Sequence, residues 1–164
     1  MALSVGDKAP DFKLTTITAE GPAHITLSEH AGGSVLLLFV PMAFTGKCTE
    51  EFCAISLGLS EYEGLGAKVI GISGDNPFAQ AAWAEKEGIT LTLVSDYEHD
   101  VAKAYGVSYD EFLPQANLTM GGVPKRSAFI VDGAGVVQYA ECNDDPAQLP
   151  DFEAIKAKLG ELNG

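Results

Sequence analysis

A short run of the sequence holds the residue types that thiol chemistry needs: Pro41, Thr45, Cys48 and Cys53. The residues before this run, 35–40, are β-branched and aliphatic, as in a buried strand. Those after it place apolar side chains three to four residues apart, as on one face of a helix. We therefore expect a strand, a loop and then a helix, with Cys48 in the first helical turn.

The first turn of a helix is a favourable place for a negatively charged cysteine. Its main-chain N–H groups have no partner within the helix, and they attract an anion. The thiolate is the nucleophilic form of cysteine. Thr45 or Gly46 can cap this helix. The placement of Cys48 therefore favours a reactive thiolate.

The charges near Cys48 in the sequence do not all favour a thiolate. Glu50 and Glu51 oppose it by like-charge repulsion, so a cation must come from elsewhere. Lys47 is adjacent, and Arg126 is a candidate from far along the chain. Glu51 could orient water or neighbouring side chains in the pocket, but it is more simply a favourable acid in the first turn of the helix, so we leave it out of the catalytic set.

The pattern Pro41-x-x-x-Thr45-x-x-Cys48 resembles that of the peroxiredoxins, thiol peroxidases of thioredoxin-like fold. Further blocks follow in the family's order: residues 5–12, Asp96 with 104–107, and 126–132. The resemblance covers nearly the whole chain. It implies that Cys48 is the peroxidatic cysteine, that Thr45 and Arg126 activate it, and that Pro41 shields the site.

The spacing of Cys48 and Cys53 resembles that of a peroxiredoxin subgroup, including bacterioferritin-comigratory proteins, in which the second cysteine resolves the first. In a helix, however, five residues rise about 7.5 Å. This exceeds the limit of roughly 7 Å on the Cα separation of a disulfide. A Cys48–Cys53 bond therefore requires the first helical turns to unwind.

Other roles for the cysteines stay open. Cys53 could be a small core residue, and Cys142 a free thiol or an alternative resolver. Cys142 does not match the far C-terminal resolving cysteine of the typical two-cysteine peroxiredoxins. The sequence also resembles the alkyl hydroperoxide reductase E-like group, in which some members use one cysteine. An external thiol could then resolve Cys48.

Alternating strand and helix patterns predict an α/β fold with a mixed central sheet. Strands are expected at 12–16, 24–27, 35–40, 68–73, 91–95, 127–131 and 136–141. Helices are expected from Cys48 to about Tyr62 and at 76–87, 98–105 and 151–162, and 108–123 is expected to be a loop near the site. With the resemblance, this predicts a thioredoxin-like fold preceded by an N-terminal hairpin extension, in a single domain over residues 1–164.

Net charge, hydropathy and cysteine content limit which partners the protein can bind and where in the cell it is expected. The net charge of −13 argues against nucleic acid and anionic membrane surfaces. The longest apolar run, 35–44, is interrupted by Pro41 and too short to span a membrane. No signal peptide is evident. An odd number of cysteines, 3, fits a reducing compartment, so a cytoplasmic location is expected.

The resemblance implies an enzyme that needs no cofactor and reduces hydrogen peroxide and alkyl hydroperoxides. It implies a thioredoxin- or glutaredoxin-type reductant and a homodimer, whose surface Phe44, Phe78 and Trp83 could form; Trp83 could equally be a core residue. No metal site is expected, because the histidines have no metal-ligand spacing with one another or with the cysteines: His24, His30 and His99.

Two other functions are alternatives to peroxide reduction. A thioredoxin-like disulfide reductase would carry Cys-x-x-Cys, but Glu51 stands at the second cysteine's place. A redox-sensing or metal-holding module could use Cys48 and Cys53. A four-ligand zinc site would then need partners from another chain.

Overall fold

The computed structural model describes residues 1–163, and its centre is a sheet of 7 strands in the order β2-β1-β5-β4-β3-β6-β7. The strands are β1 Lys13–Thr18, β2 Gly21–Thr26, β3 Ser34–Phe39, β4 Ala67–Ser73, β5 Thr92–Ser95, β6 Ser127–Val131 and β7 Val137–Cys142. Strands β3, β4 and β5 are parallel, whereas the neighbours on either side are antiparallel. The sheet is therefore mixed, as the sequence predicted.

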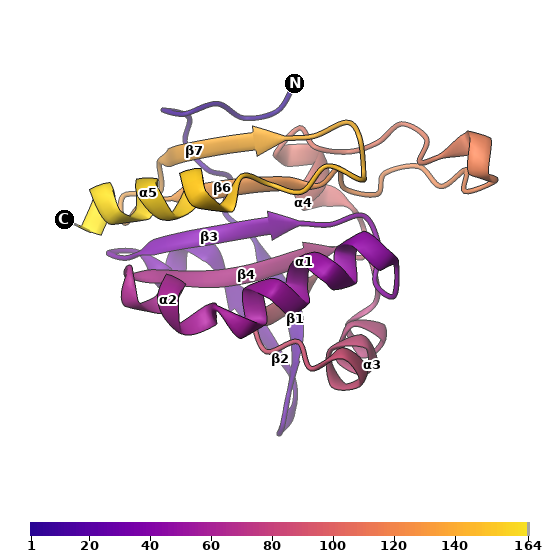
Figure 1. Cartoon of the computed structure of the whole chain (residues 1–164), viewed down its shortest axis with the longest axis horizontal. Helices are drawn as coiled ribbons and strands as arrows, with labels where there is room; N and C mark the ends of the chain where they lie inside the picture. The colour runs from indigo at the N-terminus through magenta and orange to yellow at the C-terminus, as the bar shows by residue number, and fades with distance from the viewer. Residues whose placement is uncertain (164) are drawn as a thin grey trace.

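Helices cover both faces of this sheet (Figure 1). They are α1 Gly46–Leu57, α2 Leu59–Gly64, α3 Pro77–Glu87, α4 Asp100–Ala104 and α5 Phe152–Asn163, with short 3₁₀ turns at Leu27–His30 and Pro114–Ala116. Buried side chains of α1, α2, α3 and α5 pack together in one cluster. Those of α4 join a second cluster with residues of the N-terminal segment.

Strand β3 separates the two clusters because successive side chains of a strand point to opposite faces. Leu36 and Leu38 belong to the α1 cluster. Val35, Leu37 and Phe39 belong to the α4 cluster. Every one of these side chains is buried, which explains why the sequence of β3 reads as a continuous apolar run rather than an alternating one.

A glycine lets α1 approach the sheet closely. A Cβ atom added to Gly71 in β4 would lie 2.7 Å from ring carbons of Phe52 and 2.8 Å from Leu93. Phe52 belongs to α1, only one turn beyond Cys48. The missing side chain at Gly71 thus sets how deeply the cysteine-bearing helix sits on the sheet.

The expected elements are found with small shifts of their ends, and the predicted thioredoxin-like α/β fold is confirmed. The helix expected to run from Cys48 to Tyr62 is wrong in one respect: it is interrupted at Gly58 and forms α1 and α2. The N-terminal hairpin is longer than predicted, with β1 paired to β2 from Lys13↔Thr26 to Thr18↔Gly21.

The irregular segment 108–123 projects away from the sheet as an arm (Figure 1). Isolated bridges Ser108↔Pro124 and Phe112↔Met120 join its two sides. Only its base lies towards the expected site, where the Tyr109 hydroxyl donates to the Asp144 main-chain oxygen at 2.6 Å. No helix within residues 1–163 has both the length and the apolar character needed to cross a bilayer.

Candidate active site

The loop after β3 delivers the chain to the start of α1 at the carboxyl ends of the parallel strands. Thr45 is the residue before the helix, with extended backbone angles of φ −85° and ψ 153°. The carboxylate of Asp75, which follows β4, accepts the Ala43 N–H at 2.8 Å. This bond ties the loop to the end of β4, and it therefore fixes the position of the first turn of α1, which carries Cys48.

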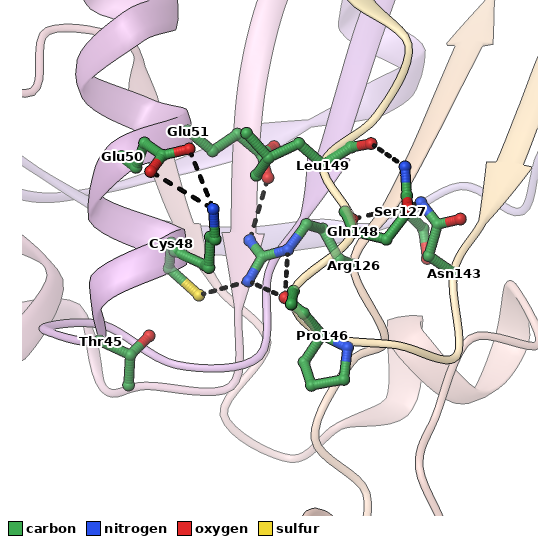
Figure 2. A network of polar contacts seen from close by, with 12 residues as sticks. Thr45, Cys48, Glu50, Glu51, Arg126, Ser127, Asn143, Pro146, Gln148 and Leu149 are labelled. Carbon is green, nitrogen blue, oxygen red and sulfur yellow. Dashed lines mark hydrogen bonds and ion pairs between the residues drawn. The ribbon is translucent and has the colours of Figure 1, made fainter.

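Arg126 is the cation that meets Cys48. Its Nη2 lies 3.4 Å from the cysteine Sγ, and the chain between them spans 78 residues (Figure 2). The sheet brings them together, because Arg126 directly precedes β6, which pairs with β3. Both residues are only 1% exposed. The guanidinium is therefore placed to donate an N–H to the cysteine sulfur.

Glu51 also contacts Arg126, and because it lies beyond the first turn of α1, its interpretation as an acid of that turn was wrong. It is 0% exposed, and its Oε1 accepts from Arg126 Nη1 at 3.0 Å. Residues three apart on a helix share a face, so a charged residue three positions after Cys48 was a usable sequence signal.

Burial and charge act on this ion pair in opposite directions. Burial raises the pKa of Glu51 to about 7, although the neighbouring guanidinium lowers it. Burial also works against the charged form of Arg126, but the negative charges of Cys48 and Glu51 raise the pKa of Arg126 overall. Arg126 therefore stays cationic while the Glu51 carboxyl can hold a proton near neutral pH.

A main-chain carbonyl completes the surroundings of Arg126. The Pro146 oxygen accepts from Nε at 3.0 Å and from Nη2 at 2.9 Å (Figure 2). Pro146 lies in the loop between β7 and α5. Sulfur, carboxylate and carbonyl oxygen thus surround one planar guanidinium, whose several N–H groups suit it to meet them together. Sequence reasoning gave no indication of Pro146.

The other predicted partners of Cys48 lie nearby in the chain but are bonded elsewhere. The Thr45 hydroxyl donates to the Met42 main-chain oxygen at 2.7 Å, and it does not cap the helix. Lys47 pairs with Glu50 at 3.4 Å on the surface. Pro41 is buried at the start of the loop.

The comparisons with known proteins agree with this geometry. The family model described as AhpC/TSA matches residues 5–140. The chain belongs to the AhpC/TSA family of peroxiredoxins. It is 36% identical over 149 residues to a putative peroxiredoxin of Synechocystis, covering 87% of this chain and 70% of that protein. It is 32% identical over 163 residues to peroxiredoxin TSA1 of Saccharomyces cerevisiae, covering 95% and 79%.

Solved structures of the family share the fold. Peroxidoxin BcpB from Mycobacterium tuberculosis superposes with a TM-score of 0.80 at 28% identity, covering 98% of both chains. AhpC from the same organism gives a TM-score of 0.83 at 24% identity, covering 100% of this chain and 95% of that one, and supports the fold alone. This peroxiredoxin is a thiol-dependent peroxidase, as the sequence pattern predicted.

The remaining cysteines of this peroxiredoxin lie apart from Cys48. Cys53 is half-buried on the same helix, and its Sγ lies 3.5 Å from the Glu87 main-chain oxygen at the end of α3. Cys142 ends β7 and packs against the α4 cluster, whereas Cys48 belongs to the α1 cluster. The sheet therefore separates Cys142 from Cys48.

Trp83 is a core residue rather than a surface one. It is 0% exposed, and its indole N–H donates to the Thr49 hydroxyl at 3.0 Å. Phe44 and Phe78 are 51% and 66% exposed. Among residues 1–163, no group of three or more histidine, cysteine or acidic side chains is placed to hold a metal ion.

Proposed function

We propose that Cys48 is the peroxidatic nucleophile of this peroxiredoxin and that Arg126 is its main activating group. The 3.4 Å contact between them in a buried site carries the proposal. The thiolate attacks one peroxide oxygen, so an S–O bond forms as the O–O bond breaks. The electron pair moves to the departing oxygen, which takes up a proton and leaves as water or an alcohol. Cys48 becomes a sulfenic acid.

Arg126 acts on the charge that moves during this step. A guanidinium N–H can donate to sulfur before the attack and to the departing oxygen as negative charge collects there. Because the guanidinium is already held by Glu51 and Pro146, little reorganisation is needed when the charge moves. Fixed donors of this kind are worth about 3–4 kcal/mol each in other enzymes.

Thr45 and Pro41 have supporting roles in this proposal. The Thr45 hydroxyl donates its proton to Met42, so its oxygen lone pairs remain able to accept the O–H of a bound hydroperoxide. Pro41 has no N–H to solvate and is buried before the loop, which suits it to shield the sulfur from water.

Cys53 is our proposed resolving cysteine. Its thiolate attacks the sulfur of the Cys48 sulfenic acid, so that the S–S bond forms while the S–O bond breaks, and the departing hydroxide takes up a proton and leaves as water. The helical positions of the two residues require α1 to unwind first. The alternative is resolution by an external thiol. Cys142 is the weaker candidate, because the sheet stands between it and Cys48.

Membership of the family supports proposals for the reductant and for the oligomeric state. We propose that a dithiol carrier of the thioredoxin or glutaredoxin type reduces the Cys48–Cys53 disulfide. We also propose a homodimer, with the exposed rings of Phe44 and Phe78 as part of its apolar surface. A cytoplasmic location is proposed because a cycle through free thiols needs a reducing compartment.

Intact mass after one equivalent of hydrogen peroxide tests the proposed roles. The wild type should lose two hydrogens, Cys53→Ser should hold a trappable sulfenic acid, and Cys48→Ser should not react. A gain of one oxygen in the wild type would mean that an external thiol resolves Cys48. An unchanged mass in the wild type would overturn the role of Cys48 itself.

A further inference from the structure

The loop between β7 and α5 holds Arg126 at two points. Its first residue, Asn143, donates its main-chain N–H to the Arg126 main-chain oxygen at 3.0 Å. Pro146 then accepts from the side chain of Arg126 through both Nε and Nη2 (Figure 2). One carbonyl oxygen that bridges two nitrogens fixes the in-plane rotation of a planar guanidinium. Residues 143–146, here named the arginine clamp, therefore aim the Nη2 that contacts Cys48.

The middle of the arginine clamp is anchored by two side chains from outside the site. The Tyr109 hydroxyl donates to the Asp144 main-chain oxygen at 2.6 Å. The Lys125 Nζ lies 2.8 Å from the Asp144 carboxylate and 5.8 Å from the centre of the Tyr109 ring. Tyr109 comes from the base of the arm, and Lys125 directly precedes Arg126. Both converge on one residue, Asp144.

We propose that Tyr109 and Lys125 are positioning residues for the peroxide reaction, acting through Asp144 and the arginine clamp. The inference rests on the proposed roles of Cys48 and Arg126. A guanidinium must meet sulfur and the departing oxygen in one geometry, and small displacements of such a group slow the reaction strongly. Tyr109 is the stronger anchor, because the Asp144 side chain is 87% exposed and its ion pair with Lys125 is weakened by solvent.

The variant Tyr109→Phe removes the hydroxyl and keeps the ring, and Tyr97→Phe is its control because Tyr97 is 61% exposed. Both are made in a Cys53→Ser, Cys142→Ser background, so that Cys48 is the only thiol. Two rates are measured at one pH: oxidation of Cys48 by hydrogen peroxide and its alkylation by iodoacetamide. Alkylation needs access to the thiolate, but it does not need Arg126 to stabilise a departing oxygen.

Tyr109→Phe should slow oxidation by about threefold to tenfold, the effect expected for one lost hydrogen bond, and leave alkylation nearly unchanged. Lys125→Gln should slow oxidation less. In the double variant Tyr109→Phe, Lys125→Gln, the loss in activation free energy should be less than the sum of the two single losses, because both side chains act on Asp144. Tyr97→Phe should match its parent in both rates.

Other outcomes reject the inference. A rise in both rates would make the loop a cover over the site rather than a clamp. Unchanged oxidation would remove Tyr109 from the mechanism, and a parallel fall of both rates with lost circular dichroism would reduce its role to folding. If the parent itself is not oxidised at Cys48, the proposed function fails instead, and this result is distinct from all the others.

Discussion

Cys48 and Cys53 lie on one unbroken helix, about 140° apart around its axis. Their thiols consequently have different neighbours: Cys48 meets Arg126, and Cys53 meets the Glu87 main-chain oxygen. A disulfide between them must break the helix and both of these contacts. In the proposed cycle, the resting structure thus holds Cys48 at Arg126 and keeps the two thiols apart.

Oxidation with one equivalent of hydrogen peroxide should therefore unfold the start of α1. We expect faster amide hydrogen exchange over residues 46–53 and a smaller helical circular dichroism signal. Fluorescence of the single tryptophan, Trp83, should change as well, because its indole bonds Thr49 in that helix. Cys142→Ser should behave as the wild type, and Cys53→Ser should keep its exchange protection. Equal protection in reduced and disulfide-bonded protein would contradict this expectation.

Arg126→Lys should slow oxidation of Cys48 by about 10²–10³-fold, the cost of losing one fixed donor at a developing charge. An ammonium keeps the positive charge but lacks the planar fork that meets Cys48, Glu51 and Pro146 together. Stopped-flow competition with a peroxidase measures the rate. Lys47→Met removes a cation from an exposed surface pair in the same helical turn as Cys48 and should react normally. A lysine variant as fast as the wild type would assign the activation to the helix start instead.

Glu51→Gln should change how stability depends on pH. The folded pKa of about 7 lies above the ordinary value of 4.5, so the native protein holds the proton more tightly than the unfolded chain. Protonation of Glu51 therefore stabilises the folded protein fully below the ordinary pKa of 4.5, and this stabilisation is lost as the pH rises through the folded pKa of about 7. Between these two pH values the free energy of unfolding should fall by an amount on the order of 3 kcal/mol.

Urea unfolding at a series of pH values between these limits measures this effect. The wild type should lose stability as pH rises across the interval, and Glu51→Gln, which cannot ionise, should show a flatter profile. Parallel profiles for the two proteins would mean that the Arg126 ion pair fully offsets the burial of Glu51.

The sequence predicted the elements well because their patterns are local. The apolar run at 35–40 predicted β3, and the helix expected at 76–87 is α3, whose start the Asn76 side chain caps by accepting the Ala79 N–H at 2.8 Å. Gly58 was missed as a helix break, since apolar spacing continues across it to Tyr62. Regular spacing alone does not reveal where a helix changes direction.

The site was harder to predict because its contacts join distant segments. Arg126 was one candidate cation from far along the chain, and its assignment to the site rested mostly on the resemblance, because nothing local indicates that it meets Cys48 across 78 residues. Pro146 acts through its main-chain oxygen, which every residue type possesses. Glu51 was misjudged because a charge near a helix start has a simpler local explanation. Only tertiary packing distinguishes that role from a buried ion pair.

Gly71→Ala should destabilise the protein by about 1–3 kcal/mol, the usual cost of overpacking a core. The added Cβ would lie 2.7 Å from the Phe52 ring, which must move and carry α1 with it. Urea unfolding measures the loss, and Phe52→Leu in the same chain should recover part of it. Oxidation of Cys48 should slow too, since the helix shift changes its distance from Arg126.

The control for Gly71→Ala is the same substitution at Gly160 in α5, where an added Cβ has open space. There alanine should stabilise the protein by about 0.5–1 kcal/mol, because glycine is the poorer helix former. Opposite signs at the two positions would tie the effect at Gly71 to contact with Phe52. If Gly71→Ala proves as stable and as reactive as the wild type, α1 can shift on the sheet without cost, and the close approach does not position Cys48.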